Sequence, residues 1–159
     1  MEAFTASHVS RTHSISLAGA PEQVFPLFEP VKEKSWAPGW EPQMVYPASG
    51  QAIEGAVFTV GADDGHKAVW TIAEYDPSAY RIAYLTVTPE SRVARIEVQC
   101  SPNSDGTTQA QVTYTFTALS EQGNSFISTQ TEESHRHRIE SWKTAINHYL
   151  RHGAPLQHH

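Results

Sequence analysis

The sequence lacks the features that mark several specialised classes of protein. It has one cysteine, Cys100, which excludes an internal disulfide and a multi-cysteine metal site. It has no run of 18 apolar residues that could cross a membrane as a helix, so membrane insertion is not expected. Residues 1–10 carry no apolar segment of the kind found in secretory signals, and we therefore expect a cytoplasmic protein.

Positive charge is also scarce. Eleven Lys and Arg residues stand against 17 Asp and Glu residues, which gives a formal net charge of −6. A net acidic chain without a basic cluster is poorly suited to binding nucleic acid or an anionic membrane surface. We expect a small hydrophobic or amphipathic molecule as the partner and no nucleic acid. The sequence leaves a monomer and a homodimer equally open.

Aliphatic side chains are few for a folded chain of 159 residues. Leu, Ile, Val and Phe together number 31, slightly under the roughly 20% below which a highly charged chain is suspected of disorder. Charged residues make up only 18% of this chain, however, and aromatic residues make up 10%. The composition therefore predicts one folded domain over residues 1–159, in which aromatic rings or an internal hollow replace the missing aliphatic volume.

The alternation of apolar and polar residues predicts an antiparallel sheet. Residues 8–18 fit a first strand, with Ile15 and Leu17 on one face, and two short helices follow, the first from Pro21 and the second over residues 31–36. Segments rich in Val, Ile, Thr and aromatic residues then recur between turn signals. They cover residues 55–61, 67–75, 79–88, 91–100 and 107–118, with one more strand around residues 44–46.

A long helix is predicted from Ser120 to His152, where Gly153 and Pro155 end it. Its second half carries an apolar stripe from Ile139 to Leu150, whereas residues 128–138 contain no apolar residue. Extending the stripe by about 100° per residue places three polar side chains on the buried face, flanked by Glu132 and Arg138. These three are Ser128, Thr131 and His135. The pattern favours a core that is packed beside the second half and hollow around His135.

Two motifs carry a resemblance to a known family. Residues 20–28 (APEQVFPLF) resemble the start of the first short helix, and residues 74–77 (EYDP) followed by Tyr80 and Arg81 resemble the strand–turn–strand signature of the START-like superfamily. This superfamily, also called SRPBCC, includes polyketide cyclases/dehydrases and lipid-transfer domains. Residues 36–40 (WAPGW) resemble an uncharacterised bacterial branch, from which no functional residue is carried over.

The resemblance, which covers about residues 8–152, implies an α+β helix-grip fold. In this fold a curved antiparallel sheet of six or seven strands wraps around a long C-terminal helix, with two short helices after the first strand. It also implies a small-molecule cavity between sheet and helix, but the fold does not itself imply catalysis. The leading hypothesis is a protein that binds a hydrophobic or amphipathic ligand in an internal cavity.

Two alternatives remain open. The first is an enzyme similar to polyketide cyclases/dehydrases, in which His135, helped by Glu132 or Tyr114, acts as general acid and base. The second is an interaction module similar to the activators of Hsp90, working through the outer face of the sheet. That face would present Arg95, Glu97, Thr113 and Thr115.

The candidate ligand-binding residues combine rings that would wall a cavity with polar groups that would orient a ligand. They are Trp36, Trp40, Trp70, Tyr84, Tyr114, Ser128, Thr131, Glu132 and His135. Two simpler interpretations compete with this one. For Trp70 and Trp142 an ordinary aromatic core is the favoured interpretation, and the polar helix residues also suit a solvated helix start.

No catalytic, metal or cofactor site is predicted. His148 and His152 lie four residues apart on a helix but have no third ligand at a suitable spacing. Asp63 and Asp64 lie in a turn beside a glycine, and Cys100 lies in a strand where a thiol behaves as a small hydrophobe. The chain has no glycine-rich phosphate loop. The terminal residues 158–159 (HH) could derive from an expression tag.

Overall fold

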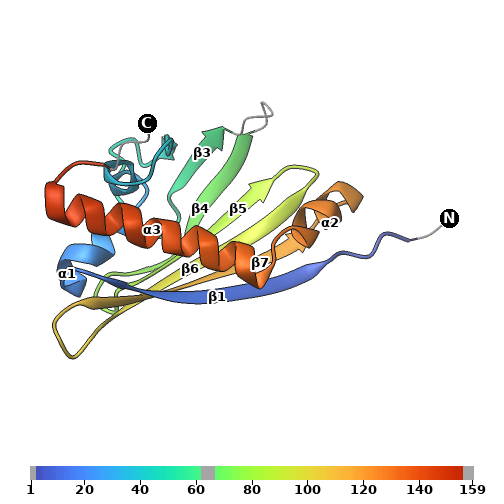
Figure 1. Cartoon of the computed structure of the whole chain (residues 1–159). Coiled ribbons are helices and arrows are strands. Elements are labelled where there is room, and N and C mark those ends of the chain that lie inside the picture. Colours follow the sequence, from blue (N-terminus) through green and yellow to red (C-terminus); the bar gives the residue numbers. More distant parts are fainter. Residues whose placement is uncertain (1–2, 62–66, 156–159) are drawn as a thin grey trace.

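The computed structural model describes residues 3–61 and 67–155. The turn predicted at residues 63–64 and the terminal histidines at 158–159 lie outside the described residues, so these two predictions are not tested. The described chain forms one seven-stranded antiparallel sheet in the order β1-β7-β6-β5-β4-β3-β2. Figure 1 shows that the sheet is curved and that a long helix, α3, crosses its concave face. The predicted α+β helix-grip fold is confirmed.

The strands follow the predicted segments closely. They are β1 (His8–Leu17), β2 (Gln43–Tyr46), β3 (Val57–Gly61), β4 (Lys67–Asp76), β5 (Arg81–Thr88), β6 (Arg92–Pro102) and β7 (Thr108–Ala118). The alternation in β6 is the clearest case, because Ala94, Ile96, Val98 and Cys100 are all buried while the residues between them are partly exposed. A strict period of two determines which face of a strand meets the core. It therefore also determines the register in which β6 pairs with its neighbouring strands.

The short helices between β1 and β2 form one side of the structure. They are α1 (Pro21–Val24) and the two 3-10 helices η1 (Phe25–Phe28) and η2 (Lys32–Ser35). Pro21 occupies the first helical position, where its missing N–H costs nothing. The apolar side chains of α1 and η1 are buried in the core, which fixes the start of the segment that carries η2 and residues 36–40.

The single long helix predicted from Ser120 to His152 is wrong. The chain forms α2 (Glu121–Ser128) and α3 (Glu132–His152), separated by residues 129–131. Thr131 caps α3, because its side-chain oxygen accepts a hydrogen bond from the Ser134 N–H at 3.1 Å. Capping by a threonine hydroxyl competes with helix continuation, so the helix restarts there. The extension of the apolar stripe back to Ser128 therefore does not hold.

The C-terminal half of α3 packs on the sheet as its apolar stripe predicts. Ile139, Ala145 and Ile146 are buried in the main core together with residues of β1 and β5–β7. Gly153, with a φ of 67°, ends the helix in the left-handed conformation that glycine adopts at little cost. No helix in the described ranges is long and apolar enough to cross a membrane.

Candidate functional site

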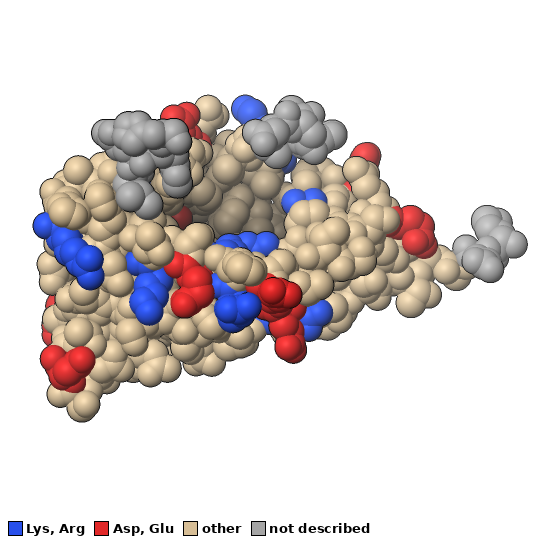
Figure 2. All heavy atoms as spheres, in the orientation of Figure 1, with Lys and Arg blue, Asp and Glu red and all other residues tan. Residues whose placement is uncertain are grey.

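A pocket of about 690 Å³ lies between the concave face of the sheet, the η2 segment and α3. Figure 2 shows the surface hollowed on this face of the molecule. The lining residues come from three places: the η2 segment, strands β4–β7 and helix α3. They are Glu33, Trp36, Ala37, Pro38, Gly39, Trp40, Trp70, Tyr84, Ile96, Val98, Tyr114, Arg138, Ser141, Trp142, Thr144 and Ala145.

All four tryptophans of the chain line this pocket. Two of them are held by hydrogen bonds to backbone: the Trp36 ring N–H donates to the Leu27 carbonyl and the Trp40 ring N–H to the Pro30 carbonyl, both at 2.7 Å. The rings also support one another, with centroids 5.9 Å apart for Trp36 and Trp142 and 5.3 Å apart for Trp40 and Trp70. The aromatic wall is therefore fixed in place before any ligand arrives.

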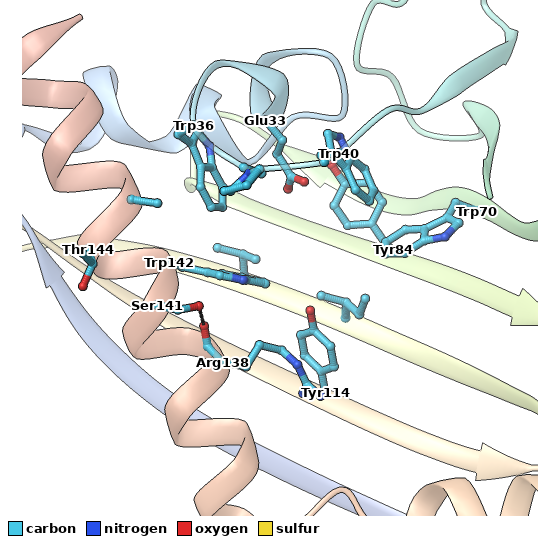
Figure 3. Close-up of a pocket in the computed structure, with 16 residues that line it drawn as sticks. Glu33, Trp36, Trp40, Trp70, Tyr84, Tyr114, Arg138, Ser141, Trp142 and Thr144 are labelled. Atoms are coloured by element: carbon cyan, nitrogen blue, oxygen red, sulfur yellow. Dashed lines mark hydrogen bonds between the residues drawn. The ribbon is translucent and has the colours of Figure 1, made fainter. Parts of the chain in front are cut away.

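The two pocket tyrosines have different environments. The Tyr84 hydroxyl donates to the Phe28 carbonyl at 2.6 Å and is thereby used in holding η1 against β5. The Tyr114 hydroxyl points into the pocket in Figure 3, and it makes no hydrogen bond to a residue in the described ranges. Burial raises the pKa of Tyr114, so its hydroxyl is neutral and free to donate or accept.

Glu33 is the acidic residue of the pocket. It lies on η2, and Figure 3 shows its carboxyl group directed into the space between the tryptophans. Within the described part of the chain this carboxyl makes no side-chain hydrogen bond and no ion pair. Burial among apolar side chains raises the pKa of the Glu33 carboxyl well above its usual range, because the charged form loses its hydration.

Arg138 enters the pocket from α3. One terminal nitrogen of its guanidinium group donates to the Gln130 side-chain oxygen, and the other lies 3.5 Å from Nδ1 of His135. The guanidinium carbon lies 4.8 Å from the centre of the Tyr114 ring, a cation–π distance. Among the described residues no carboxylate lies within 4.0 Å of it. Its positive charge is therefore held by neutral groups alone.

His135 is buried but lies outside the pocket lining, whereas the sequence pattern predicts it at the centre of the polar ligand-binding groups. It is 1% exposed, and its Nε2 lies 3.1 Å from the Val112 carbonyl, to which it donates. Burial lowers the pKa of His135, and the nearby charge of Arg138 lowers it further, so the ring is neutral. A neutral ring that donates through Nε2 presents Nδ1 as an acceptor, which fits the neighbouring Arg138.

The structure brings together the five predicted aromatic residues but not the predicted polar ones. Trp36, Trp40, Trp70, Tyr84 and Tyr114 all line the pocket. Ser128, Thr131 and Glu132 are exposed at the junction of α2 and α3 and lie outside the lining. The physical reason is the break between the two helices, which turns these side chains away from the face that His135 and Ile139 share.

Sequence reasoning missed Glu33 as a pocket residue and gave Arg138 only a flanking position. Glu33 lies within the charged segment KEKS, which has the appearance of a solvated turn, and no sequence signal separates it from its lysine neighbours. Trp142, for which an ordinary core position was the favoured interpretation, both packs against Phe28 and lines the pocket. Its spacing of four residues from Arg138 is the signal that would have placed both on one face.

No cluster of three His, Cys, Asp or Glu side chains suited to a metal ion occurs within the described part of the chain. Cys100 is buried in β6, and burial raises the pKa of its thiol to about 12. At neutral pH this thiol is protonated and is not poised as a nucleophile.

Comparison with known proteins finds similarity at the level of structure only. No protein-family model matches the chain, and no curated protein matches it by sequence. Norcoclaurine synthase from Thalictrum flavum superposes with a TM-score of 0.68 at 10% identity, over 92% of this chain and 88% of that one. A hypothetical protein from Helicobacter pylori gives 0.71 at 9% identity, over 89% and 87% of the two chains.

A protein from the dynemicin biosynthetic locus gives a TM-score of 0.60 at 14% identity, over 92% of this chain and 48% of that one. At such identities the similarity shows a shared fold. These solved structures therefore support the predicted fold and carry no further conclusion about this chain.

Proposed function

We propose that this protein binds a hydrophobic or amphipathic small molecule that carries at least one ring. The observation that carries the proposal is the pocket of about 690 Å³ whose walls include all four tryptophans and two tyrosines. Ligand sites in proteins are typically concave, mostly apolar and largely preformed, with a few polar groups that orient the ligand. The pocket has each of these properties.

The polar groups of the pocket support binding over simple core packing. Glu33 and Tyr114 present a carboxyl and a hydroxyl group to the pocket, and neither has a side-chain partner among the described residues. A filled core would leave such groups without hydrogen bonds at a cost of about 1–3 kcal/mol each. A ligand with hydroxyl or carbonyl groups would supply the missing partners.

The proposal is tested with a neutral fluorescent probe, N-phenyl-1-naphthylamine, whose emission rises in an apolar site. We expect saturable binding at one site per chain, and about tenfold weaker binding by Trp70→Leu, which corresponds to about 1.4 kcal/mol. Tyr46→Leu is the control, because Tyr46 is 59% exposed on β2 and lies outside the pocket. Native mass spectrometry of protein purified from its own host would show a co-purifying molecule. Failure to bind the probe, with no co-purifying mass, would contradict the proposal.

An acid–base enzyme is the second candidate, and Glu33 is the observation that favours it. A pocket carboxyl group whose pKa is raised by burial is a candidate for giving or taking a proton, and the Tyr114 hydroxyl faces the same space. If the co-purified molecule is converted on incubation with the protein, Glu33→Gln should abolish conversion. Under this candidate His135→Gln should retain it, because His135 lies outside the pocket lining.

A further inference from the structure

We propose that the ligand is an aromatic anion, whose carboxylate or sulfonate-like group pairs with Arg138 while its rings lie among the tryptophans. The inference rests on the proposed function and names the chemical class that the same pocket takes. It also assigns Arg138 as the residue that recognises the charge. Nothing in the resemblance to the START-like superfamily points to this residue.

The charge of Arg138 has no counter-charge in the described structure. Each ion pair among the described residues uses other side chains, chiefly on the outer face of the sheet, where Glu74 and Glu97 pair with Arg81 and Arg95 at 2.9–3.3 Å. Glu140, the nearest acid along α3 on the C-terminal side, lies 3.6 Å from His13 instead. A partly buried cation without an anion loses hydration and gains little in return, so an incoming anion would be stabilised there.

Glu33, the acidic residue of the pocket, does not supply the missing counter-charge of Arg138. Glu33 lies on η2, and Figure 3 shows it on the wall opposite the helix that carries Arg138. No ion pair joins the two residues within 4.0 Å. Glu33 is therefore not the ion-pair partner of Arg138. Its carboxyl group, whose pKa burial raises, is instead placed to form a hydrogen bond with a ligand hydroxyl or carbonyl.

The guanidinium group is oriented and yet retains free donors. A guanidinium has five N–H groups, and the structure uses one on each terminal nitrogen, toward Gln130 and His135. The His135 ring is itself fixed by its bond to the Val112 carbonyl, and Gln130 is buried at 8% exposure. Three donors therefore have no hydrogen-bond partner among the described residues, on a group whose position is set by two buried neutral partners. This is the arrangement that a charge-assisted hydrogen bond requires.

The position of Arg138 explains where the anionic end would lie. A second, smaller pocket of about 270 Å³ lies along the concave face of the sheet and shares four lining residues with the larger one. The shared residues are Trp70, Ile96, Tyr114 and Arg138. Arg138 thus lies at the inner boundary of the aromatic pocket, so the rings would occupy the larger space and the anionic group its far end.

The test uses two probes with the same ring system. N-phenyl-1-naphthylamine is neutral, whereas 8-anilinonaphthalene-1-sulfonate adds one sulfonate to the same frame. We expect the wild-type protein to bind the sulfonate probe about tenfold or more tightly than the neutral probe, the range expected for hydrogen bonds to a charged group. Arg138→Gln should remove this preference while its affinity for the neutral probe stays within about threefold of wild type.

Arg136→Gln is the matched control, because it removes the same charge from the same helix at an exposed position that pairs with Glu133 at 3.8 Å. It should keep the full preference, and Arg138→Lys should keep part of it. Binding of the neutral probe by Arg138→Gln also shows that this variant is folded. Equal binding of the two probes by wild type, or an equal loss of preference in Arg136→Gln, would overturn the inference and leave the proposed function standing. Binding of neither probe would count against the proposed function itself.

Discussion

Gly123, on the first turn of α2, lies in close contact with the backbone of the turn between β5 and β6. A β-carbon placed on it would lie 2.9 Å from the Ser91 carbonyl carbon and nearer still to the carbonyl oxygen, where real β-carbons keep at least 3.0 Å. The β-carbon of Ala118 would lie at 3.2 Å. The obstacle is mainly backbone, at the turn between β5 and β6, so it cannot move aside as a flexible side chain would. Gly123→Ala therefore requires α2 to shift as a unit.

The expected cost follows from two opposing effects. Alanine is favoured over glycine in a helix by about 1 kcal/mol, which by itself would stabilise the protein. Overpacking a close contact costs about 1–3 kcal/mol and occasionally more, and here the clash is with backbone. The shift of α2 would also loosen Ile127, which is 3% exposed in the small core beside β6 and β7. We expect a net loss of about 2 kcal/mol in the free energy of unfolding, or about 4–8 °C in Tm for a domain of this size.

Urea unfolding followed by circular dichroism measures this difference directly, provided that the slope m is unchanged. Gly61→Ala is the control, because a β-carbon at Gly61 meets no atom of the described residues within 4 Å and the residue has no positive φ. It should lie within about 0.5 kcal/mol of wild type. If Gly123→Ala is as stable as wild type or more stable, the close approach of α2 to the Ser91 carbonyl is wrong.

Two further predictions concern pH and have opposite signs. Since burial lowers the pKa of His135 in the fold, the unfolded chain binds its proton first as pH falls below about 6.5. In urea titrations between pH 7 and 5, the free energy of unfolding of wild type should therefore fall relative to that of His135→Gln, by no more than about 1.4 kcal/mol per pH unit. The control is His137→Gln at an exposed position, whose free energy of unfolding should stay parallel to that of wild type. For Glu33, whose folded pKa is raised, stability should instead fall as pH rises above about 4.5. The stability of Glu33→Gln relative to wild type, measured by thermal unfolding, should therefore increase between about pH 4.5 and 7.5. Glu54 is an exposed turn residue, and an equal increase in Glu54→Gln would refute the placement of Glu33 in the pocket.

Most of the fold could be predicted from the sequence because its strands obey a strict period of two. Ile96 and Val98 in β6, and Ala110 and Val112 in β7, are each separated by one residue that faces the other side. Such alternation leaves one register in which every apolar residue is buried. The two short helical regions after β1 were equally readable, because Pro21 and Pro30 delimit the first of them.

The break between α2 and α3 could not be found from apolar periodicity, because residues 128–138 contain no apolar residue that would reveal a change of phase. A capping signal was nevertheless present. Thr131 is followed by Glu132 and Glu133, and acidic residues in the first turn after a threonine are typical of a helix start. Weighing that signal against a continuous helix would have separated Ser128 from His135.

The aromatic wall of the pocket could be predicted, but its position along α3 could not. The low aliphatic content favoured a hollow around His135, but His135 is packed against the Tyr114 ring at a centroid distance of 5.2 Å and the space there is filled. The pocket lies further along α3, beside Arg138 and Trp142. Composition indicates that apolar volume is missing from a core, but only three-dimensional packing decides which side chains surround the gap.

The pairing of the first strand with the last has a consequence for how the chain reaches this structure. His8 and Thr117 are neighbours across β1 and β7 although 109 residues separate them. The strands β2 to β7 each pair with the next along the chain, so that part can form through local hairpins. β1 can pair only after β7 has formed. Closing the long loop between these two strands is entropically costly and slow. During synthesis β1 therefore emerges before β2 to β7 but is placed only after β7 is available, and the sheet is not complete before that point.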